Sequence, residues 1–184
     1  MDATDVANDL EAVLLTEDQI LTRVGTLARE LHELYGPRTP ILVGVLGGAA
    51  TFTVDLARAY PAQLEIGWMA VKSYSTHNRA SGSVRLLKDL DLDITGRDIV
   101  IVDSVIDTGL TMSWLIANLA QRSPASVAVC ALLRKPETAR FADTPTYVGF
   151  EVGEGLIVGY GMDHNGLYRN LRSAALLSKA RYTS

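Results

Sequence analysis

Apolar and polar positions alternate along this chain with a period that changes from segment to segment. Residues 16–19 (TEDQ) have the pattern of a helix capping box, and apolar residues then recur every three or four positions from Ile20 to Leu34. Gly36-Pro37 ends that pattern, so the sequence predicts a first helix between these two signals. Residues 41–46 (ILVGVL) form a short apolar run with β-branched side chains, which predicts a buried strand.

The following segments continue the alternation of strands and helices. Gly47-Gly48 precedes a helical pattern over residues 52–57, and residues 64–72 (LEIGWMAVK) predict another strand. Residues 73–83 (SYSTHNRASGS) are polar and contain Gly and Ser. A loop of that length inside a compact domain is usually a lid or a disordered tip, and residues 84–87 predict a strand that returns from it.

The second half of the chain repeats this pattern. Residues 99–103 (IVIVD) predict the central strand, followed by a helix from near Thr108 to near Arg122. Three further strands are predicted over residues 126–133, 147–151 and 156–160. Strands that alternate with helices are typical of a parallel sheet covered on both faces. We therefore expect an α/β fold in a single domain, residues 1–184, in which residues 1–12 form a flexible segment.

Composition narrows the class of protein. The chain has 184 residues, of which 48% are hydrophobic and 21% charged, as expected of a globular protein with one sizeable core. The net charge of −4 and the lack of a basic block argue against extended nucleic-acid binding. No apolar run has the length of a membrane span, and residues 1–15 are acidic, so we expect a cytoplasmic protein that does not bind membranes.

Cysteine and histidine give no sign of a thiol or zinc site. Cys130 is the single cysteine and stands in an apolar run (SVAVCALL), which favours a packed and inert thiol. His32, His77 and His164 lack the spacing of metal ligands. The sequence therefore does not predict zinc chemistry or a nucleophilic cysteine.

The strongest candidate for chemistry is the segment 99–112 (IVIVDSVIDTGLTM), in which a buried strand leads into an acidic turn and a helix. Such a turn offers backbone N–H groups, two threonine hydroxyls and a helix N-terminus to a phosphate. The same residues also fit an ordinary helix whose N-cap is Asp107 or Thr108, and the segment alone leaves both interpretations open.

The surroundings of this turn favour the interpretation as a ligand site. Asp103 places a carboxylate at the end of a strand, where a sheet in an α/β fold binds its ligands. The Gly47-Gly48 turn, the polar loop 73–83 and the acidic segment 161–163 add three further features that a ligand site needs.

Seven segments occur in the order of one enzyme family: VGVLGGAATF, MAVKSY, RLLKDLD, IVIVDSVIDTGLTMSWL, ALLRKPE, VGFEV and IVGYGMDHNGLYRNL. In these segments, which fall between residues 13 and 171, the chain resembles the hypoxanthine-guanine phosphoribosyltransferases. These type I phosphoribosyltransferases join a purine to the pentose of phosphoribosyl diphosphate and release diphosphate. The resemblance implies their fold, a mainly parallel central sheet flanked by helices with a small hood over the base site.

The resemblance also implies roles for individual residues. Asp107 matches the proposed general base near purine N7, and Lys135 matches a lysine that bonds the 6-oxo group of the base. The implied 5-phosphate cradle is Asp107, Thr108, Gly109, Leu110 and Thr111. The other implied sites are Asp103 and Ser104 for the sugar, Leu46, Gly47, Gly48 and Arg169 for diphosphate, Ser73 and Tyr74 for the start of the flexible loop, and Lys135, Leu156, Ile157 and Asp163 for the base.

The family's cofactor and partners follow from the same resemblance. Mg²⁺ is the implied cofactor, with Asp103 and Asp163 as its protein ligands. The implied partners are a small-molecule purine and a pentose diphosphate donor, and the chain is expected to form a homodimer or homotetramer. Loss of diphosphate goes through an oxocarbenium-like state, so the site must neutralise the leaving group while a closing loop excludes water.

The chain departs from the family's pattern at three sites, which comprise four residues. Asp103-Ser104 stands in place of Glu-Asp, Gly47 in place of a lysine or arginine, and Leu156 in place of an aromatic residue that stacks on the purine. One alternative is therefore a divergent enzyme of specialised nucleoside biosynthesis, which uses an adenine-like or 7-deazapurine base or a ketose-derived pentosyl donor. A second alternative is a non-catalytic nucleotide-sensing protein, although that function does not need the general base Asp107.

Overall fold

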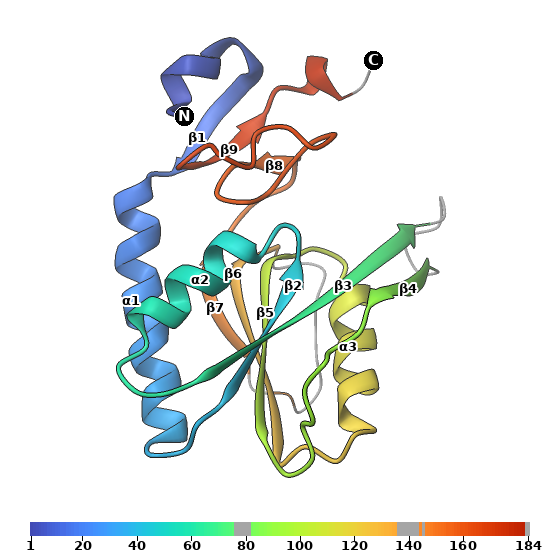
Figure 1. Cartoon of the computed structure of the whole chain (residues 1–184). Coiled ribbons are helices and arrows are strands. Elements are labelled where there is room, and N and C mark those ends of the chain that lie inside the picture. The colour runs from blue at the N-terminus through green and yellow to red at the C-terminus, as the bar shows by residue number, and fades with distance from the viewer. Residues whose placement is uncertain (76–81, 136–143, 145, 183–184) are drawn as a thin grey trace.

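The computed structural model describes residues 1–75, 82–135, 144 and 146–182, and for residues 74, 75 and 82 it describes the backbone alone. Helices and strands alternate along most of the chain (Figure 1). Their order is η1 (Ala3–Asp9), β1 (Leu10–Leu15), α1 (Glu17–Tyr35), β2 (Ile41–Leu46), α2 (Ala50–Ala59), β3 (Glu65–Ser75), β4 (Gly82–Lys88), β5 (Asp98–Ile106), α3 (Leu110–Ala120), β6 (Ser126–Arg134), β7 (Thr146–Glu151), β8 (Ile157–Val158), β9 (Ala174–Leu177) and η2 (Lys179–Arg181).

A six-stranded sheet forms the centre of the molecule, with the strand order β4-β3-β2-β5-β6-β7. All neighbouring strands run parallel except the pair β3 and β4, which is antiparallel. Strands β2, β5 and β6 are apolar along most of their length because both faces of this part of the sheet are covered. The predicted α/β class and mainly parallel sheet are therefore confirmed.

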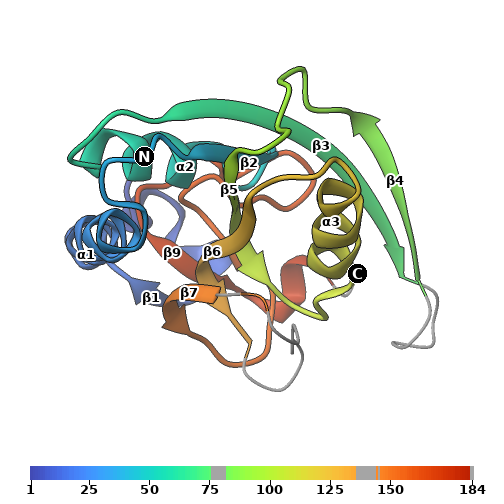
Figure 2. The same ribbon diagram turned by 90° about the horizontal axis from the view of Figure 1, so that it is seen from below.

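Helices cover the two faces of the sheet unequally (Figure 2). On one face, residues of α1 and α2 pack with Leu42, Val100 and Leu132 of the sheet in one hydrophobic cluster. On the other face, residues of α3 pack with Ile41, Ile101 and their neighbours in a second cluster. Residues next to each other in a strand thus contribute to different clusters, as the alternation of side chains in a strand requires.

A second sheet forms a hood above the carboxyl ends of the parallel strands (Figure 1). It has three strands in the order β1-β9-β8, so the N-terminal and C-terminal segments meet in it. Residues 1–12, which we expected to form a flexible segment, contain η1 and the start of β1. Local sequence gave no sign of this because β1 is stabilised by antiparallel pairing with the distant β9.

Several predicted element boundaries are confirmed and others need correction. The first helix begins after Thr16, whose hydroxyl accepts a hydrogen bond from the Gln19 N–H at 3.3 Å in the predicted capping box. The loop predicted at residues 73–83 is shorter, because β3 continues to Ser75 and β4 begins at Gly82; residues 76–81 lie outside the described part. The predicted strand 156–160 is only Ile157–Val158, since the left-handed backbone from Gly159 onward cannot continue a strand.

Within the described residues, no helix combines the length and the apolar composition that a membrane crossing requires.

Gly159→Ala is expected to lower the free energy of unfolding by about 1–3 kcal/mol. Gly159 has φ of +94°, and a Cβ added there would collide with the carbonyl oxygen of Ser173 in the hood. Gly153→Ala is the matched control, because it has no atom within 4 Å of the added Cβ and no positive φ. Urea unfolding of the two variants measures the difference, and equal stabilities would contradict this account of the hood.

Candidate active site

A cleft of about 280 Å³ lies beyond the carboxyl end of β5. Parallel strands place their carboxyl ends at one edge of a sheet, which is where ligands bind in folds of this type. The cleft is lined by Ser73, Asp103, Val105, Ile106, Asp107, Thr108, Gly109, Thr111 and Met112. The structure thus brings Asp103 and the predicted phosphate residues Asp107, Thr108, Gly109 and Thr111 together with Ser73. The predicted sugar residue Ser104 and the predicted phosphate residue Leu110 do not line this cleft.

The turn between β5 and α3 presents the N-terminus of a helix to this cleft. Gly109 is the N-cap of α3 and has φ of +76°, a conformation that glycine adopts without strain. The Leu110 N–H donates to Thr108 Oγ1 at 3.4 Å, whereas the described residues offer no acceptor to the N–H groups of Thr111 and Met112. The site therefore offers free amides and the positive end of the helix dipole to an anion.

Neither residue proposed for an ordinary cap is the N-cap of α3. Asp107 and Thr108 precede Gly109 and are both exposed. The helix begins at Leu110, two residues later than the sequence predicted. This geometry favours the interpretation of residues 107–111 as an anion-binding turn over that of a simple helix cap.

Asp103 is the carboxylate in the floor of the cleft. Burial raises the pKa of Asp103 to about 7, although hydrogen bonds from the Ser104 and Val105 amides act in the opposite direction. The Ser104 N–H donates to Asp103 Oδ1 at 2.7 Å. A carboxylate that burial makes costly to ionise gains stabilisation when a cation is bound beside it.

Asp103→Asn is expected to raise the free energy of unfolding at pH 8 by about 1–3 kcal/mol. The pKa of Asp103 rises from 3.8 in an unfolded chain to about 7 in the folded protein, so only the folded state keeps the proton between these values. The stability of the wild type therefore falls as pH rises through this window, whereas the asparagine variant lacks this contribution. Urea unfolding between pH 4 and 8 tests this expectation, and a constant difference between the two proteins would contradict it.

Asp107 and Lys135 form an ion pair at the mouth of the cleft. Lys135 Nζ lies 2.9 Å from Asp107 Oδ2, although 28 positions separate the two residues in sequence. The Lys135 side chain is 10% exposed and that of Asp107 55% exposed. The backbone holds the pair in place, because the Lys135 N–H donates to the Ile106 carbonyl at 3.0 Å. The general-base candidate and the base-binding candidate are thus direct neighbours.

The Gly47-Gly48 turn lies against the hood. A Cβ on Gly47 would be 3.4–3.5 Å from the guanidinium of Arg169, and a Cβ on Gly48 would be 2.7 Å from Ser104 Oγ. Arg169 Nη1 also donates to the Gly161 carbonyl at 2.7 Å. Leu46 ends β2 directly before this turn. The guanidinium of Arg169 therefore lies beside position 47, where the resemblance led us to expect a cationic side chain.

The two predicted metal ligands are not equivalent in the structure. Asp103 lines the cleft, whereas Asp163 Oδ1 pairs with Arg169 Nη2 at 2.8 Å and Asp163 Oδ2 accepts the Gly166 N–H at 2.8 Å. The described residues contain no group of three side chains arranged to hold a metal. Mg²⁺ is usually bound by one or two carboxylates together with water and phosphate oxygens, so Asp103 fits it better than Asp163.

The predicted base-binding residues lie at the junction of the main sheet and the hood. Lys135 follows β6, and Ile157 begins β8 and is 7% exposed. Leu156 directly precedes β8, and its carbonyl accepts the Leu177 N–H at 2.8 Å. The side chain of Tyr74, predicted at the start of the loop, lies outside the described residues.

Sequence reasoning missed four residues of this region. Val105, Ile106 and Met112 line the cleft, and the only signal for them was that they lie close in sequence to Asp103, Asp107 and Thr111. Tyr160 was also missed, because it was taken as part of a strand.

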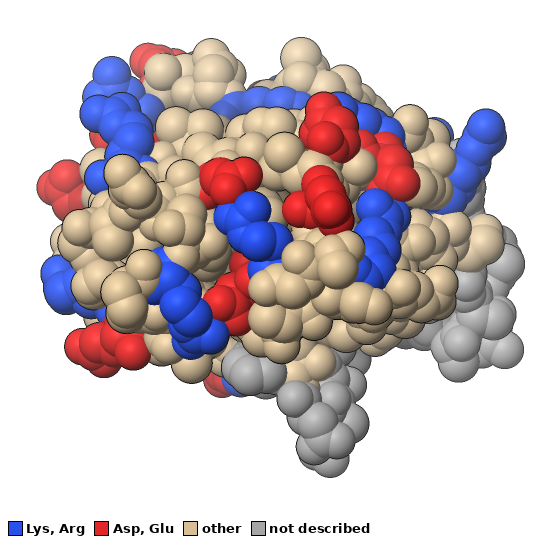
Figure 3. Space-filling view, turned by 60° about the horizontal axis from the view of Figure 1, so that its bottom comes forward, with Lys and Arg blue, Asp and Glu red and all other residues tan. Residues whose placement is uncertain are grey.

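On the face that Figure 3 shows, Lys and Arg side chains are interspersed with Asp and Glu, and no extended basic surface is visible there.

Comparisons with known proteins place the chain among relatives of one kind. Residues 14–165 match the family model of the phosphoribosyl transferase domain. The hypoxanthine-guanine phosphoribosyltransferase of Mycobacterium avium is 44% identical over 180 residues, which cover 95% of this chain and 89% of the relative. That of Bacillus subtilis is 39% identical over 96% of this chain and 98% of the relative.

Solved structures show the same similarity. The hypoxanthine phosphoribosyltransferase of Staphylococcus aureus superposes with a TM-score of 0.91 at 33% identity and covers 98% of both chains. The hypoxanthine-guanine phosphoribosyltransferase of Bacillus anthracis, solved with a HEPES molecule in its active site, has a TM-score of 0.87 at 33% identity, and the match covers 92% of this chain and 100% of that chain.

Proposed function

This chain belongs to the phosphoribosyltransferase family, and we propose that it is a purine phosphoribosyltransferase. It transfers a 5-phosphopentosyl group from a donor of the phosphoribosyl diphosphate type to a purine nitrogen and releases diphosphate, with Mg²⁺. One structural observation supports this proposal most strongly. A single cleft of about 280 Å³ joins the free amides of a helix N-terminus to Asp103 and to Asp107, which Lys135 contacts.

The 5-phosphate end of the donor fits the turn at residues 108–111. The amides of Thr111 and Met112 and the hydroxyls of Thr108 and Thr111 are hydrogen-bond donors at the positive end of α3. Such a site binds a phosphate without a large basic surface, which agrees with the net charge of −4. The pentose then lies over Asp103, which stands inside β5 near its carboxyl end.

Transfer exchanges one bond at the anomeric carbon for another. The bond from this carbon to the diphosphate oxygen breaks, the purine nitrogen bonds to the carbon, and the proton of the purine moves to a base. Asp107 is the base that we propose, because its carboxylate is exposed at the mouth of the cleft. Asp103 would hold Mg²⁺, which when bound would supply charge neutralisation at the diphosphate.

The base is an oxopurine in this proposal. The Lys135 ammonium group donates hydrogen bonds and accepts none, so it fits the 6-oxo group of hypoxanthine or guanine and not the 6-amino group of adenine. The named relatives are hypoxanthine-guanine phosphoribosyltransferases, which supports the same choice. We also propose that the protein acts in purine salvage in the cytoplasm. We propose further that it forms a homodimer or homotetramer, and light scattering in solution measures which.

The alternatives are less well supported. A larger ketose-derived donor needs the volume beside Gly47, but the guanidinium of Arg169 lies against that position. The compared proteins give no support to a modified purine or to a nucleotide sensor. We therefore interpret Ser104 and Leu156 as side-chain differences that leave the proposed activity the same.

A steady-state assay tests the proposal. The protein is incubated with phosphoribosyl diphosphate, Mg²⁺ and hypoxanthine, guanine or adenine, and nucleotide and diphosphate are measured together. We expect one diphosphate per nucleotide with hypoxanthine and guanine and at least about 10²-fold lower kcat/KM with adenine. Nucleotide binding without turnover on any of the bases would contradict the proposal and favour a sensor.

A further inference from the structure

We infer that the hydrogen bond between Tyr160 and Asp55 positions Arg169 over the diphosphate turn at Gly47-Gly48. Tyr160 and Asp55 are thus positioning residues for the donor, which neither the sequence nor the family comparison assigned. The inference rests on the proposed function and deepens it, because it says what fixes the position of the hood relative to the diphosphate turn.

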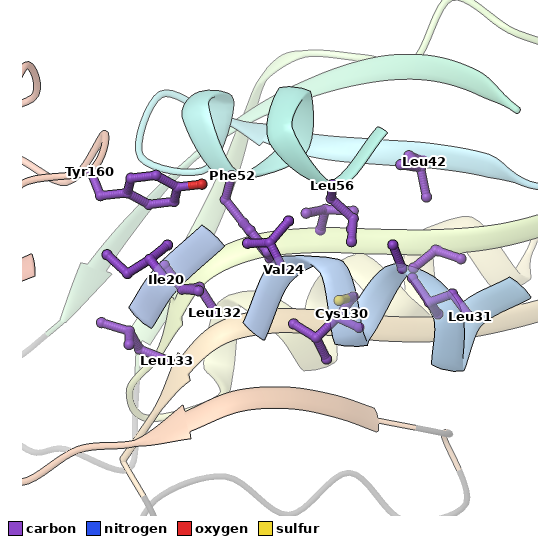
Figure 4. Close-up of a cluster of buried hydrophobic side chains, with 14 of the residues drawn as sticks. Ile20, Val24, Leu31, Leu42, Phe52, Leu56, Cys130, Leu132, Leu133 and Tyr160 are labelled. Atoms are coloured by element: carbon purple, nitrogen blue, oxygen red, sulfur yellow. The ribbon is translucent and has the colours of Figure 1, made fainter. Parts of the chain in front are cut away.

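Tyr160 connects the hood to α2. Its hydroxyl donates to Asp55 Oδ2 at 2.6 Å, across 105 positions of sequence. Figure 4 shows the ring of Tyr160 beside Phe52 of α2, and the side chain belongs to the same buried cluster. Since α2 begins directly after Gly47-Gly48-Ala49, the bond joins the hood to the helix that carries the diphosphate turn.

The backbone at this junction is unusual and tightly constrained. Gly159, Tyr160 and Gly161 have φ values of +94°, +49° and +96° in succession. A left-handed conformation is unfavourable for a tyrosine, so other contacts must hold Tyr160 there. Its N–H donates to the Leu171 carbonyl at 2.7 Å, and its hydroxyl donates to Asp55.

Gly161 transmits the position of Tyr160 to the diphosphate turn. A Cβ on Gly161 would collide with the Gly48 carbonyl oxygen, so the two backbones are in direct contact. The Gly161 N–H donates to the Arg169 carbonyl at 3.0 Å, and the Gly161 carbonyl accepts from Arg169 Nη1 at 2.7 Å. A shift of Tyr160 therefore moves Arg169 relative to Gly47.

Arg169 is the group through which this contact acts. Its side chain is 43% exposed, and its guanidinium is held by Asp163 at 2.8 Å and lies against Gly47, where the chain has no side chain of its own. Position 47 carries no cationic side chain, so the positive charge beside the leaving diphosphate comes from Arg169. The strength of that interaction depends on where the hood places the Arg169 guanidinium. The Asp55–Tyr160 bond fixes that placement.

Tyr160→Phe tests the inference because it removes the hydroxyl and keeps the buried ring. We expect the Kd of Mg²⁺-diphosphate, measured by calorimetry, and the KM of phosphoribosyl diphosphate each to rise by about 5–20-fold. The KM of hypoxanthine is expected to change by less than about twofold. Asp55→Asn keeps a hydrogen-bond acceptor and is expected to rescue most of the affinity that Asp55→Leu loses.

Tyr60→Phe is the matched control. Tyr60 is the C-cap of α2, and its buried hydroxyl has no hydrogen-bond partner among the described residues. We expect no change in either constant for this variant. A double-mutant cycle separates positioning from general stability, because Tyr160→Phe should have no further effect on diphosphate binding in an Arg169→Ala background.

The outcomes distinguish this inference from the proposed function. If the wild type binds Mg²⁺-diphosphate and Tyr160→Phe weakens that binding but no purine is turned over, the proposed function fails and the inference stands. If the wild type is active and Tyr160→Phe binds diphosphate as the wild type does, the inference is wrong. The inference is also wrong if Tyr160→Phe weakens diphosphate binding as much in the Arg169→Ala background as it does in the wild type.

Discussion

Asp107→Asn is expected to lower the kcat of purine transfer by about 10²–10³-fold while changing the Kd of the product nucleotide by less than about threefold. The asparagine side chain keeps the size and an acceptor oxygen of Asp107 but accepts no proton. Nucleotide binding is expected to depend mainly on the Thr111 and Met112 amides in the first turn of α3, which this substitution leaves in place. Stopped-flow turnover and calorimetric titration of the same preparation measure the two effects.

The control for this substitution is Asp91→Asn. Asp91 has a 76% exposed side chain that pairs with Lys88 at 3.5 Å, and it does not line the cleft. Wild-type turnover is expected for this variant. If Asp107→Asn also keeps wild-type kcat, Asp107 is not the general base and the proton leaves by another route.

Lys135→Ala is expected to lower kcat/KM for hypoxanthine and guanine by about 10–10²-fold, because a hydrogen bond from a charged donor to the 6-oxo group is lost. The Kd of phosphoribosyl diphosphate without a base is expected to stay within about threefold of that of the wild type. The substitution also removes the 2.9 Å contact with Asp107. We therefore expect selectivity for oxopurines over adenine to fall in parallel, which a competition assay with both bases measures.

Lys88→Ala provides the corresponding control. Lys88 bonds to the carbonyls of Trp68 and Asp89 at 3.2 and 3.0 Å, at a distance in sequence from every predicted base-binding residue. Its kinetic constants are expected to match those of the wild type. An unchanged preference for oxopurines in Lys135→Ala would show that another group recognises the base.

The central part of the fold was predictable from the sequence because its signals are local. Strands β2, β5 and β6 are nearly continuous apolar runs, and the first helix has a capping box at Thr16. The hood was not predictable in this way. Its strand β1 is mostly exposed and gains its order from pairing with β9 near the other end of the chain, which no local pattern reveals.

The candidate site follows the same division. Asp103 and the turn at residues 107–111 could be proposed from the end of one apolar strand, and the structure places them in one cleft. The contact between Lys135 and Asp107 depends on the pairing of β5 with β6, and that of Arg169 with Gly47 depends on the hood. These contacts join segments that are distant in sequence. The sequence alone could therefore suggest a role for each residue, but not which of them lie next to each other.

In the proposed function, the cleft after β5 binds the 5-phosphate of a nucleotide and directs its base toward Lys135. A crystal structure of the protein with GMP and Mg²⁺-diphosphate tests this claim most directly. We expect the 5-phosphate within hydrogen-bond distance of the Thr111 and Met112 amides and the 6-oxo group within hydrogen-bond distance of Lys135 Nζ. A nucleotide bound outside this cleft, or with its phosphate away from the N-terminus of α3, would contradict the account.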